Sequence, residues 1–217
     1  MIQAILWDMD GVLVDTTEAH FWSWSIALKE HGLKLSRQEF LSTFGKNNRA
    51  TLHQLFGPLP EEVIIGITDR KEVLFRQNLD GQVEVYPGVL DWLKYAQDQH
   101  ILCAIASSAP LENINAVLEH FDMGMYFTAL ISASEMPSKP DPAVFLAAAN
   151  ALNISLKNCL VVEDAPSGAS AAKSTGMHCL VVLTTRTQPE FPEVDFFLNR
   201  LSDISPFEIL NKIDQAA

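Results

Sequence analysis

Two aspartates, Asp8 and Asp10, directly follow a short apolar run at residues 2–7. Such a run, ended by a turn signal, predicts a buried strand of a parallel sheet, and ligands of these sheets bind beyond the carboxyl ends of the strands. Two close carboxylates lose hydration and repel each other unless a cation holds them, and Mg²⁺ readily combines one or two carboxylates with a substrate phosphate. Gly11 permits a turn that brings backbone N–H groups toward a bound anion. The simpler alternative is that both aspartates cap the next segment.

More polar residues follow later predicted strands. Ser107 comes after the second strand, Glu163 and Asp164 come after a later one, and Lys139 lies in a loop held by two prolines. Taken singly, the serine and the acids could be helix caps, and the lysine a solvated loop charge. Because the carboxyl ends of parallel strands meet at one edge of the sheet, we expect these residues to lie near Asp8.

Apolar runs typical of strands alternate with helical patterns through most of the chain. This alternation predicts an α/β fold with a doubly wound, Rossmann-like parallel sheet and helices on both faces. The predicted strands are residues 2–7, 101–106, 129–131, 159–162, 178–183 and 195–198, and the predicted helices between them are 89–99, 110–121, 143–152 and 169–174.

The alternation is interrupted early in the chain by helical patterns with no strand among them. Helices are expected at residues 17–32, 36–45, from Asn47 or Asn48 to just before Gly57, and 60–79. Successive helices of this kind predict a small bundle. We therefore expect a four-helix cap domain at residues 16–83, inserted into a core domain formed by residues 1–15 and 84–217.

Composition narrows the class of protein. The chain has 217 residues, a formal net charge of −12 and 48% hydrophobic residues, which predicts a folded protein without a nucleic-acid partner. Cys103, Cys159 and Cys179 lie in apolar runs and are expected to be buried free thiols of a reducing compartment. We find no signal peptide and no apolar run of the ~18 residues that a membrane helix needs. A cytoplasmic monomer or weak dimer without membrane contact is expected.

Four motifs in order resemble the haloacid dehalogenase superfamily across nearly the whole chain. They are D-M-D-G-V-L-V-D from Asp8, A-S-S-A around Ser107, S-K-P-D-P around Lys139, and V-V-E-D-A-P-S-G-A-S-A-A around Asp164. The position of the helical insert, between the first and second motifs, is similar to the subgroup that includes β-phosphoglucomutase and phosphoglycolate phosphatase. The resemblance implies an enzyme that handles phosphate esters.

The resemblance also implies roles for the motif residues. Asp8 would attack phosphorus and carry an aspartyl-phosphate, and Asp10 would act as general acid and base. Ser107 would bond a phosphoryl oxygen, and Lys139 would neutralise charge on the phosphoryl group and on Asp8. The implied Mg²⁺ ligands are Asp8, the main-chain carbonyl of Asp10, and Asp164, with Glu163 nearby or acting through water.

The cap should determine specificity, because a lid over the phosphate contacts the rest of the substrate. Several of its residues match β-phosphoglucomutase in type and spacing. His20 could orient Asp10 or relay a proton, and Arg49 and Lys71 could bind a second phosphate or a sugar hydroxyl, although each could instead be an ordinary surface or inter-helix contact. The candidate substrate-binding residues are Thr16, His20, Arg49, Lys71 and, after the second motif, Ser108.

The match to β-phosphoglucomutase fails at one place in the sequence. The mutase has a Lys-Asn pair that helps to seat a phosphate, where this chain has Pro110 and Leu111. We therefore favour a Mg²⁺-dependent phosphatase of a small phosphorylated metabolite, a sugar or polyol phosphate. A β-phosphoglucomutase-like mutase is the main alternative. Dehalogenation is disfavoured because it needs no metal site, and a non-catalytic phosphate-binding module because every expected catalytic residue is retained.

Overall fold

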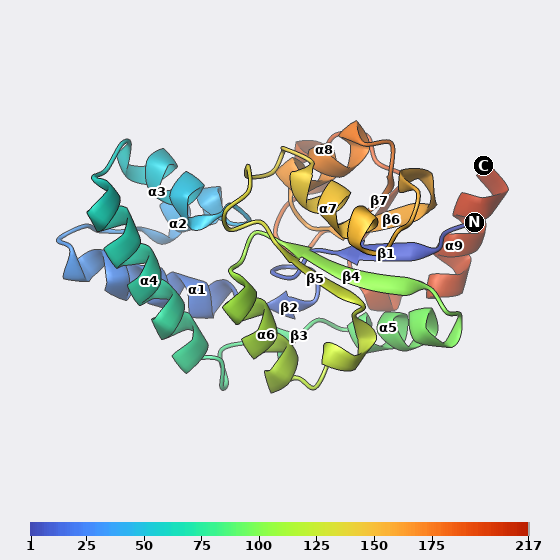
Figure 1. Cartoon of the computed structure of the whole chain (residues 1–217), viewed down its shortest axis with the longest axis horizontal. Coiled ribbons are helices and arrows are strands. Elements are labelled where there is room, and N and C mark those ends of the chain that lie inside the picture. Colours follow the sequence, from blue (N-terminus) through green and yellow to red (C-terminus); the bar gives the residue numbers. More distant parts are fainter. Residues whose placement is uncertain (217) are drawn as a thin grey trace.

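Strand β1 (Ala4–Trp7) lies inside a parallel sheet in the computed structural model, which describes residues 1–216. Within these residues the sheet has the strand order β5-β4-β1-β6-β7-β8 (Figure 1). The chain runs from β1 to β4 and β5 on one side and to β6, β7 and β8 on the other, so the direction of winding reverses beside β1. The predicted doubly wound parallel sheet is confirmed. The other strands are β4 (Leu102–Ser107), β5 (Ala129–Ser132), β6 (Cys159–Glu163), β7 (His178–Val182) and β8 (Phe196–Leu198).

Alternating side chains of β1 enter two different cores. Ile5 and Trp7 pack into one hydrophobic cluster, and Ala4 and Leu6 pack into another on the opposite face. Helices α5 (Val89–Asp98), α6 (Leu111–His120) and α9 (Pro206–Ala216) contribute to the first cluster, and α7 (Ala143–Ala151) and α8 (Pro166–Ser174) to the second. Short 3₁₀ turns lie at Gly124–Tyr126, Leu156–Asn158, Gln188–Glu190 and Leu201–Asp203.

The inserted segment folds as helices α1 (Thr17–Glu30), α2 (Arg37–Thr43), α3 (Asn48–Phe56) and α4 (Glu61–Gln77). We call these the cap helices. Ser36 begins α2 with a capping box to Glu39, and Asn47 begins α3 by accepting a hydrogen bond from the Ala50 backbone N–H. The cap helices have a hydrophobic cluster of their own, which includes Trp24, Leu28, Phe40, Leu52, Ile67 and Leu74.

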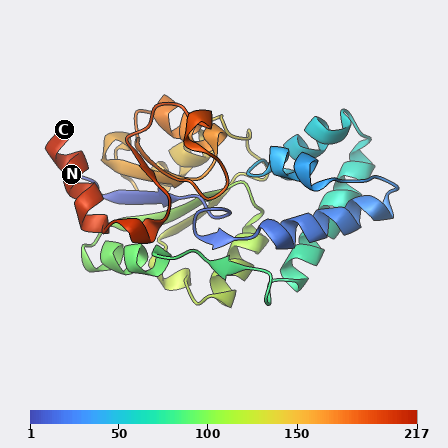
Figure 2. The same ribbon diagram turned by 180° about the vertical axis from the view of Figure 1, so that it is seen from behind.

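Two short strands connect the cap helices to the sheet. Strand β2 (Val14–Asp15) precedes α1, strand β3 (Glu84–Val85) follows α4, and the two pair antiparallel. The cap helices lie at the end of the molecule opposite the two termini (Figures 1 and 2). This arrangement supports our proposed division into a cap domain at residues 16–83 and a core domain at 1–15 and 84–217.

The three cysteines are buried and free, as predicted. Burial raises the pKa of the Cys103 and Cys159 thiols to about 11. Within residues 1–216, no helix combines the length and the apolar character needed to cross a membrane.

Candidate active site

The carboxyl ends of β1, β4 and β6 bring the predicted polar residues together. Strand β1 pairs with β4 through Trp7 and Ile105 and with β6 through Trp7 and Val162, so the residues after these positions lie side by side. The Asp8 backbone N–H donates to the Val162 carbonyl at 3.0 Å, which continues the β1–β6 pairing into the site. The predicted residues Asp8, Ser107, Glu163 and Asp164 are all buried here.

Lys139 reaches this group from the loop before α7. Its Nζ atom lies 2.7 Å from Asp8 Oδ1 and 2.6 Å from Glu163 Oε1, and it also donates to the Ala106 carbonyl at 3.3 Å. Burial lowers the pKa of the Lys139 ammonium, but the two carboxylates outweigh burial, and its pKa is raised overall. Lys139 is therefore a permanent buried cation beside Asp8.

Three buried acids share this single cation. Carboxylate oxygens of Asp8, Glu163 and Asp164 all lie within 4.8 Å of one another. Burial raises the pKa of Asp8 to about 7 despite Lys139, and burial with the nearby Glu163 and Asp8 carboxylates raises the pKa of Asp164 well above its ordinary value. This excess of negative charge and the all-oxygen donor set fit a hard divalent cation such as Mg²⁺.

The Glu163 carboxylate is occupied by protein donors. Its Oε1 atom accepts from Lys139, and its Oε2 atom accepts from the backbone N–H groups of Asp164 and Ala165, each at 2.8 Å. Asp164 instead accepts one side-chain hydrogen bond, from Thr185 Oγ1 at 2.5 Å. Of the two neighbouring acids, Asp164 is thus better placed to offer an oxygen directly to a cation.

Two glycines leave room for these carboxylates. A Cβ atom on Gly11, which has φ +89°, would overlap the Asp164 carboxylate, and a Cβ atom on Gly168 would overlap the Glu163 carboxylate. The nearest atoms are those of the two carboxylates, so the carboxylates would have to move. The glycine at 168, inside α8, is needed for space rather than for its backbone conformation.

We expect Gly168→Ala to weaken the binding of added Mg²⁺ about tenfold or more, because it displaces a carboxylate of the candidate cation site. Overpacking should also lower the free energy of unfolding by about 1–3 kcal/mol. Calorimetry with Mg²⁺ and urea unfolding would measure both effects. Gly124→Ala is the control, since a Cβ atom there meets nothing within 4 Å. Equal Mg²⁺ affinity and equal stability of the two variants would contradict the inference that Gly168 is needed to leave room for the Glu163 carboxylate.

Asp10 is held separately from the acid cluster. Its Oδ1 atom accepts from Thr16 Oγ1 at 2.5 Å and lies 3.2 Å from His20 Nε2. Burial raises the pKa of Asp10, but His20 and Thr16 outweigh it, and the pKa is lowered overall. Burial lowers the pKa of His20, whose ring stacks on Phe75 with 4.1 Å between centroids. Because a carboxylate only accepts hydrogen bonds, the His20 Nε2–H donates to Asp10.

A small cavity of about 50 Å³, open to solvent, lies between the cap helices and the strand ends. Ser108 helps to close it, because its Oγ atom donates to the Gly45 carbonyl of the cap at 3.0 Å. The lining includes Asp8, Asp10 and residues of the cap. It consists of Asp8, Asp10, His20, Trp24, Phe40, Thr43, Phe44, Gly45, Lys46, Asn48, Thr51, Lys71, Glu72, Ser107, Ser108, Ala109 and Pro110.

The candidate substrate-binding residues divide into two groups. His20, Lys71 and Ser108 line the cavity, and Thr16 is buried behind it against Asp10. Arg49 lies outside, with more than half of its side chain exposed, and donates to Glu61 at 2.9 Å. The expected contact of Arg49 with the cavity is therefore not found, because an ion pair within the cap holds its guanidinium on the outer face.

Two residues near the site were not singled out from the sequence. Thr185 follows β7 and positions Asp164, so the same strand-end rule that indicated Ser107 applies to it. Glu72 is a buried carboxylate in the cavity wall. Because most glutamates on helices are solvated, its spacing alone gave no signal.

Comparison with known proteins agrees with this geometry. Residues 5–182 match the family described as haloacid dehalogenase-like hydrolase. The chain is 29% identical to hexitol phosphatase B of Escherichia coli (strain K12), with 96% of this chain and 97% of that protein covered. It is 28% identical to β-phosphoglucomutase of Bacillus subtilis, with 83% of each covered.

Solved structures show the same fold. A β-phosphoglucomutase from Clostridium difficile superimposes with a TM-score of 0.89 at 22% identity, covering 100% of this chain and 99% of that one. CbbY from Rhodobacter sphaeroides, in complex with phosphate, gives a TM-score of 0.87 at 24% identity, covering 97% of this chain and 100% of that one. Since the family match spans most of the sequence, this chain is an enzyme of the haloacid dehalogenase-like hydrolase family.

Proposed function

We propose that the chain is a Mg²⁺-dependent phosphatase that hydrolyses a small phosphorylated metabolite, a sugar or polyol phosphate, through an aspartyl-phosphate at Asp8. The observation that carries this proposal is the convergence of Lys139 and Asp164 on Asp8, which lines the cavity between the cap helices and the strand ends. The substrate class is supported by two relatives, hexitol phosphatase B and the phosphorylated carbohydrates phosphatase of Thermotoga maritima, which is 28% identical over 81% of this chain.

In the first step, an oxygen of the Asp8 carboxylate bonds to phosphorus and the bond from phosphorus to the ester oxygen breaks. Asp10 gives a proton to the departing oxygen. Because the pKa of Asp10 is lowered by His20 and Thr16, it must take up this proton from solvent as substrate binds, and the negative charge of the phosphate favours that uptake. The product alcohol then leaves.

In the second step, water attacks phosphorus and Asp10 takes the water proton. The bond from phosphorus to Asp8 breaks, which frees inorganic phosphate and restores both carboxyl groups. Ser107 donates to a phosphoryl oxygen in both steps, and Lys139 offsets the charge that Asp8 gains and loses. Thr16 and His20 hold the Asp10 carboxyl in place throughout.

The residues that would hold Mg²⁺ are Asp8, Asp164 and the main-chain carbonyl of Asp10. Glu163 would act next to the ion rather than as a ligand, since Lys139 and two backbone N–H groups occupy its oxygens. When bound, the ion would supply positive charge to the phosphoryl oxygens.

A β-phosphoglucomutase-like activity is the second candidate, and the positions of His20 and Lys71 in the cavity favour it. Pro110 lines the same cavity and offers no donor to a second phosphate. Incubation of the chain with β-glucose 1-phosphate and a trace of glucose 1,6-bisphosphate distinguishes the phosphatase activity from the mutase activity. A phosphatase releases inorganic phosphate, whereas a mutase produces glucose 6-phosphate.

We expect phosphate release from a panel of about a hundred phosphorylated metabolites to be greatest with sugar or polyol monophosphates. Chelation of divalent ions should lower this release at least about 100-fold, and added Mg²⁺ should restore it. Phosphate assays on the panel measure both. Activity that survives chelation would contradict the metal requirement, and no release from any compound would contradict the proposed function.

A further inference from the structure

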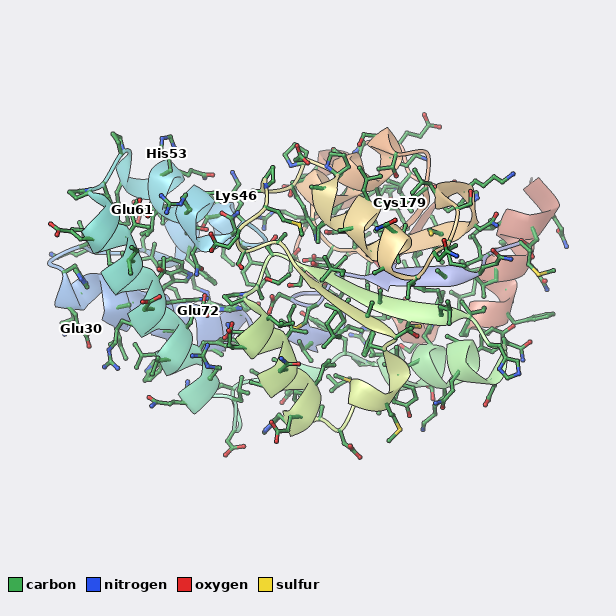
Figure 3. All side chains as sticks on the ribbon, viewed as in Figure 1. Glu30, Lys46, His53, Glu61, Glu72 and Cys179 are labelled. Atoms are coloured by element: carbon green, nitrogen blue, oxygen red, sulfur yellow. The ribbon has the colours of Figure 1, made fainter. Side chains whose placement is uncertain are left out.

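Glu72 of α4 is a buried carboxylate that the proposed chemistry does not use. Its side chain accepts three hydrogen bonds, and only 7% of the residue is exposed. Oε1 accepts from Lys71 Nζ at 2.9 Å and from Asn48 Nδ2 at 2.7 Å. Oε2 accepts from Asn113 Nδ2 at 2.5 Å. Figure 3 labels Glu72 on the side of α4 that faces α6.

These donors come from both parts of the molecule. Lys71 and Asn48 belong to the cap helices, whereas Asn113 is a fully buried residue of α6 in the core. Asn113 is itself fixed, because its Oδ1 atom accepts from Arg76 Nη1 at 2.8 Å. The Glu72 carboxylate is thus held from two sides in one orientation. Hydrogen bonds to both oxygens favour its charged form.

Glu72 cancels the charge of Lys71 in the cavity wall. Lys71 is 3% exposed, and its Nζ atom lies 5.5 Å from the ring centroids of both Trp24 and Phe75. In this apolar setting its ion partner is Glu72, and both residues line the cavity. The other lysine in the lining, Lys46, is exposed and donates to Gln54. This part of the wall therefore presents a neutral pair of one donor and one acceptor.

We propose that Glu72 makes the cavity selective for substrates with a single phosphate group. This proposal rests on the proposed function, since it places that one phosphate at Asp8. A hydroxyl group can donate to Glu72 and accept from Lys71, so the pair suits the polar, uncharged remainder of a sugar or polyol phosphate. A second phosphate would meet the negative charge of Glu72 and a lysine whose charge is already balanced.

Binding can be measured without turnover in an Asp8→Asn background with Mg²⁺ present. The probes are glucose 6-phosphate or sorbitol 6-phosphate, whichever binds more tightly, and the 1,6-bisphosphate of the same carbon chain. Calorimetry gives the two dissociation constants for Asp8→Asn alone and with Glu72→Gln added. Glu62→Gln is the matched control, because Glu62 is an exposed residue in the first turn of the same helix.

We expect Asp8→Asn to bind the monophosphate at least about tenfold more tightly than the bisphosphate. Glu72→Gln should shift this ratio at least about tenfold toward the bisphosphate, and Glu62→Gln should change it less than about twofold. A loosened cap would weaken both ligands together and leave the ratio unchanged, so the ratio reports charge selection rather than folding.

The proposal is overturned if the bisphosphate binds Asp8→Asn as tightly as the monophosphate does, or if neither ligand binds. It is also overturned if Glu72→Gln changes the ratio of the two dissociation constants no more than Glu62→Gln does. Phosphate release by the unmodified chain is assayed in parallel. Selective binding without any release would overturn the proposed phosphatase activity and leave the role of Glu72 standing. Phosphate release without selective binding of the monophosphate would overturn the role of Glu72 and leave the proposed phosphatase activity standing.

Discussion

Replacing Asp8 with asparagine is expected to reduce phosphate release at least about 10⁴-fold while leaving the chain folded. Asparagine keeps the size of the side chain but removes the anionic oxygen that would bond to phosphorus, and loss of a nucleophile has effects of this order or larger. Asparagine can still accept a hydrogen bond from Lys139, which lies 2.7 Å from Asp8 Oδ1. The measurement is kcat with the best substrate of the metabolite panel.

Asp98→Asn provides the matched control, because Asp98 is an exposed residue at the end of α5. Circular dichroism and a thermal scan should show that both variants are folded. If Asp8→Asn retained release within about tenfold of the unmodified chain, an oxygen other than that of Asp8 would have to attack phosphorus, and the mechanism would be wrong.

Lys139→Met should have the second largest effect, on stability as well as on activity. Methionine fills a similar volume but leaves the buried carboxylates of Asp8 and Glu163 without their cation. Removal of one partner of a buried ion pair typically costs about 3–5 kcal/mol, and we expect a loss of this size in metal-free buffer at pH 8. Phosphate release should also fall about 10³-fold. Urea unfolding measures the first effect and steady-state kinetics the second.

The stability loss in Lys139→Met should depend on pH. The pKa of Asp8 is raised to about 7 by burial even though Lys139 lowers it, so it should rise further without Lys139. A folded-state pKa above the unfolded value means that this contribution to stability is fully present below about pH 4 and is lost as the pH rises toward the folded-state pKa. The loss in the unmodified chain is complete near pH 7, whereas in the variant, whose Asp8 pKa is higher, it continues above pH 7. The deficit relative to the unmodified chain should therefore be smaller at pH 5.5 than at pH 8.

Added Mg²⁺ offers a second check on the same variant. If uncompensated negative charge causes the deficit, a divalent cation should recover part of the stability at pH 8. Lys173→Met is the control, because Lys173 is a half-exposed lysine paired with Asp195 on the core surface. An equal loss in both variants, independent of pH, would show that the charge of Lys139 is not what stabilises the site.

The core fold could be predicted because its strands are short apolar runs followed by polar turns. The run at residues 2–7 includes β1, and its alternating side chains enter two cores. Helix α9 (Pro206–Ala216) was missed although Ile209, Leu210 and Ile213 have helical spacing and are buried. Strands β2 and β3 were also missed, because two residues are too few for a periodic pattern and only their pairing stabilises them.

The site was predictable where it follows the sheet and less so where it depends on the cap. Asp8 and Asp164 come directly after strands and Ser107 ends one, so parallel topology alone brings them together. The positions of the cap side chains depend on how the cap helices pack against one another and against the core, which a single sequence does not specify. Arg49 and Glu72 illustrate this difference, because the arginine pairs on the outer surface and the glutamate lies buried in the cavity.

The most direct test is a crystal structure of the chain with Mg²⁺ and beryllium trifluoride, which imitates a phosphoryl group on a carboxylate. The account predicts that beryllium is bonded to an Asp8 carboxylate oxygen, with Lys139 and Ser107 in contact with its fluorines and Mg²⁺ shared with Asp164. An adduct on any other residue, or a fully occupied Mg²⁺ with Asp8 unmodified, would contradict it.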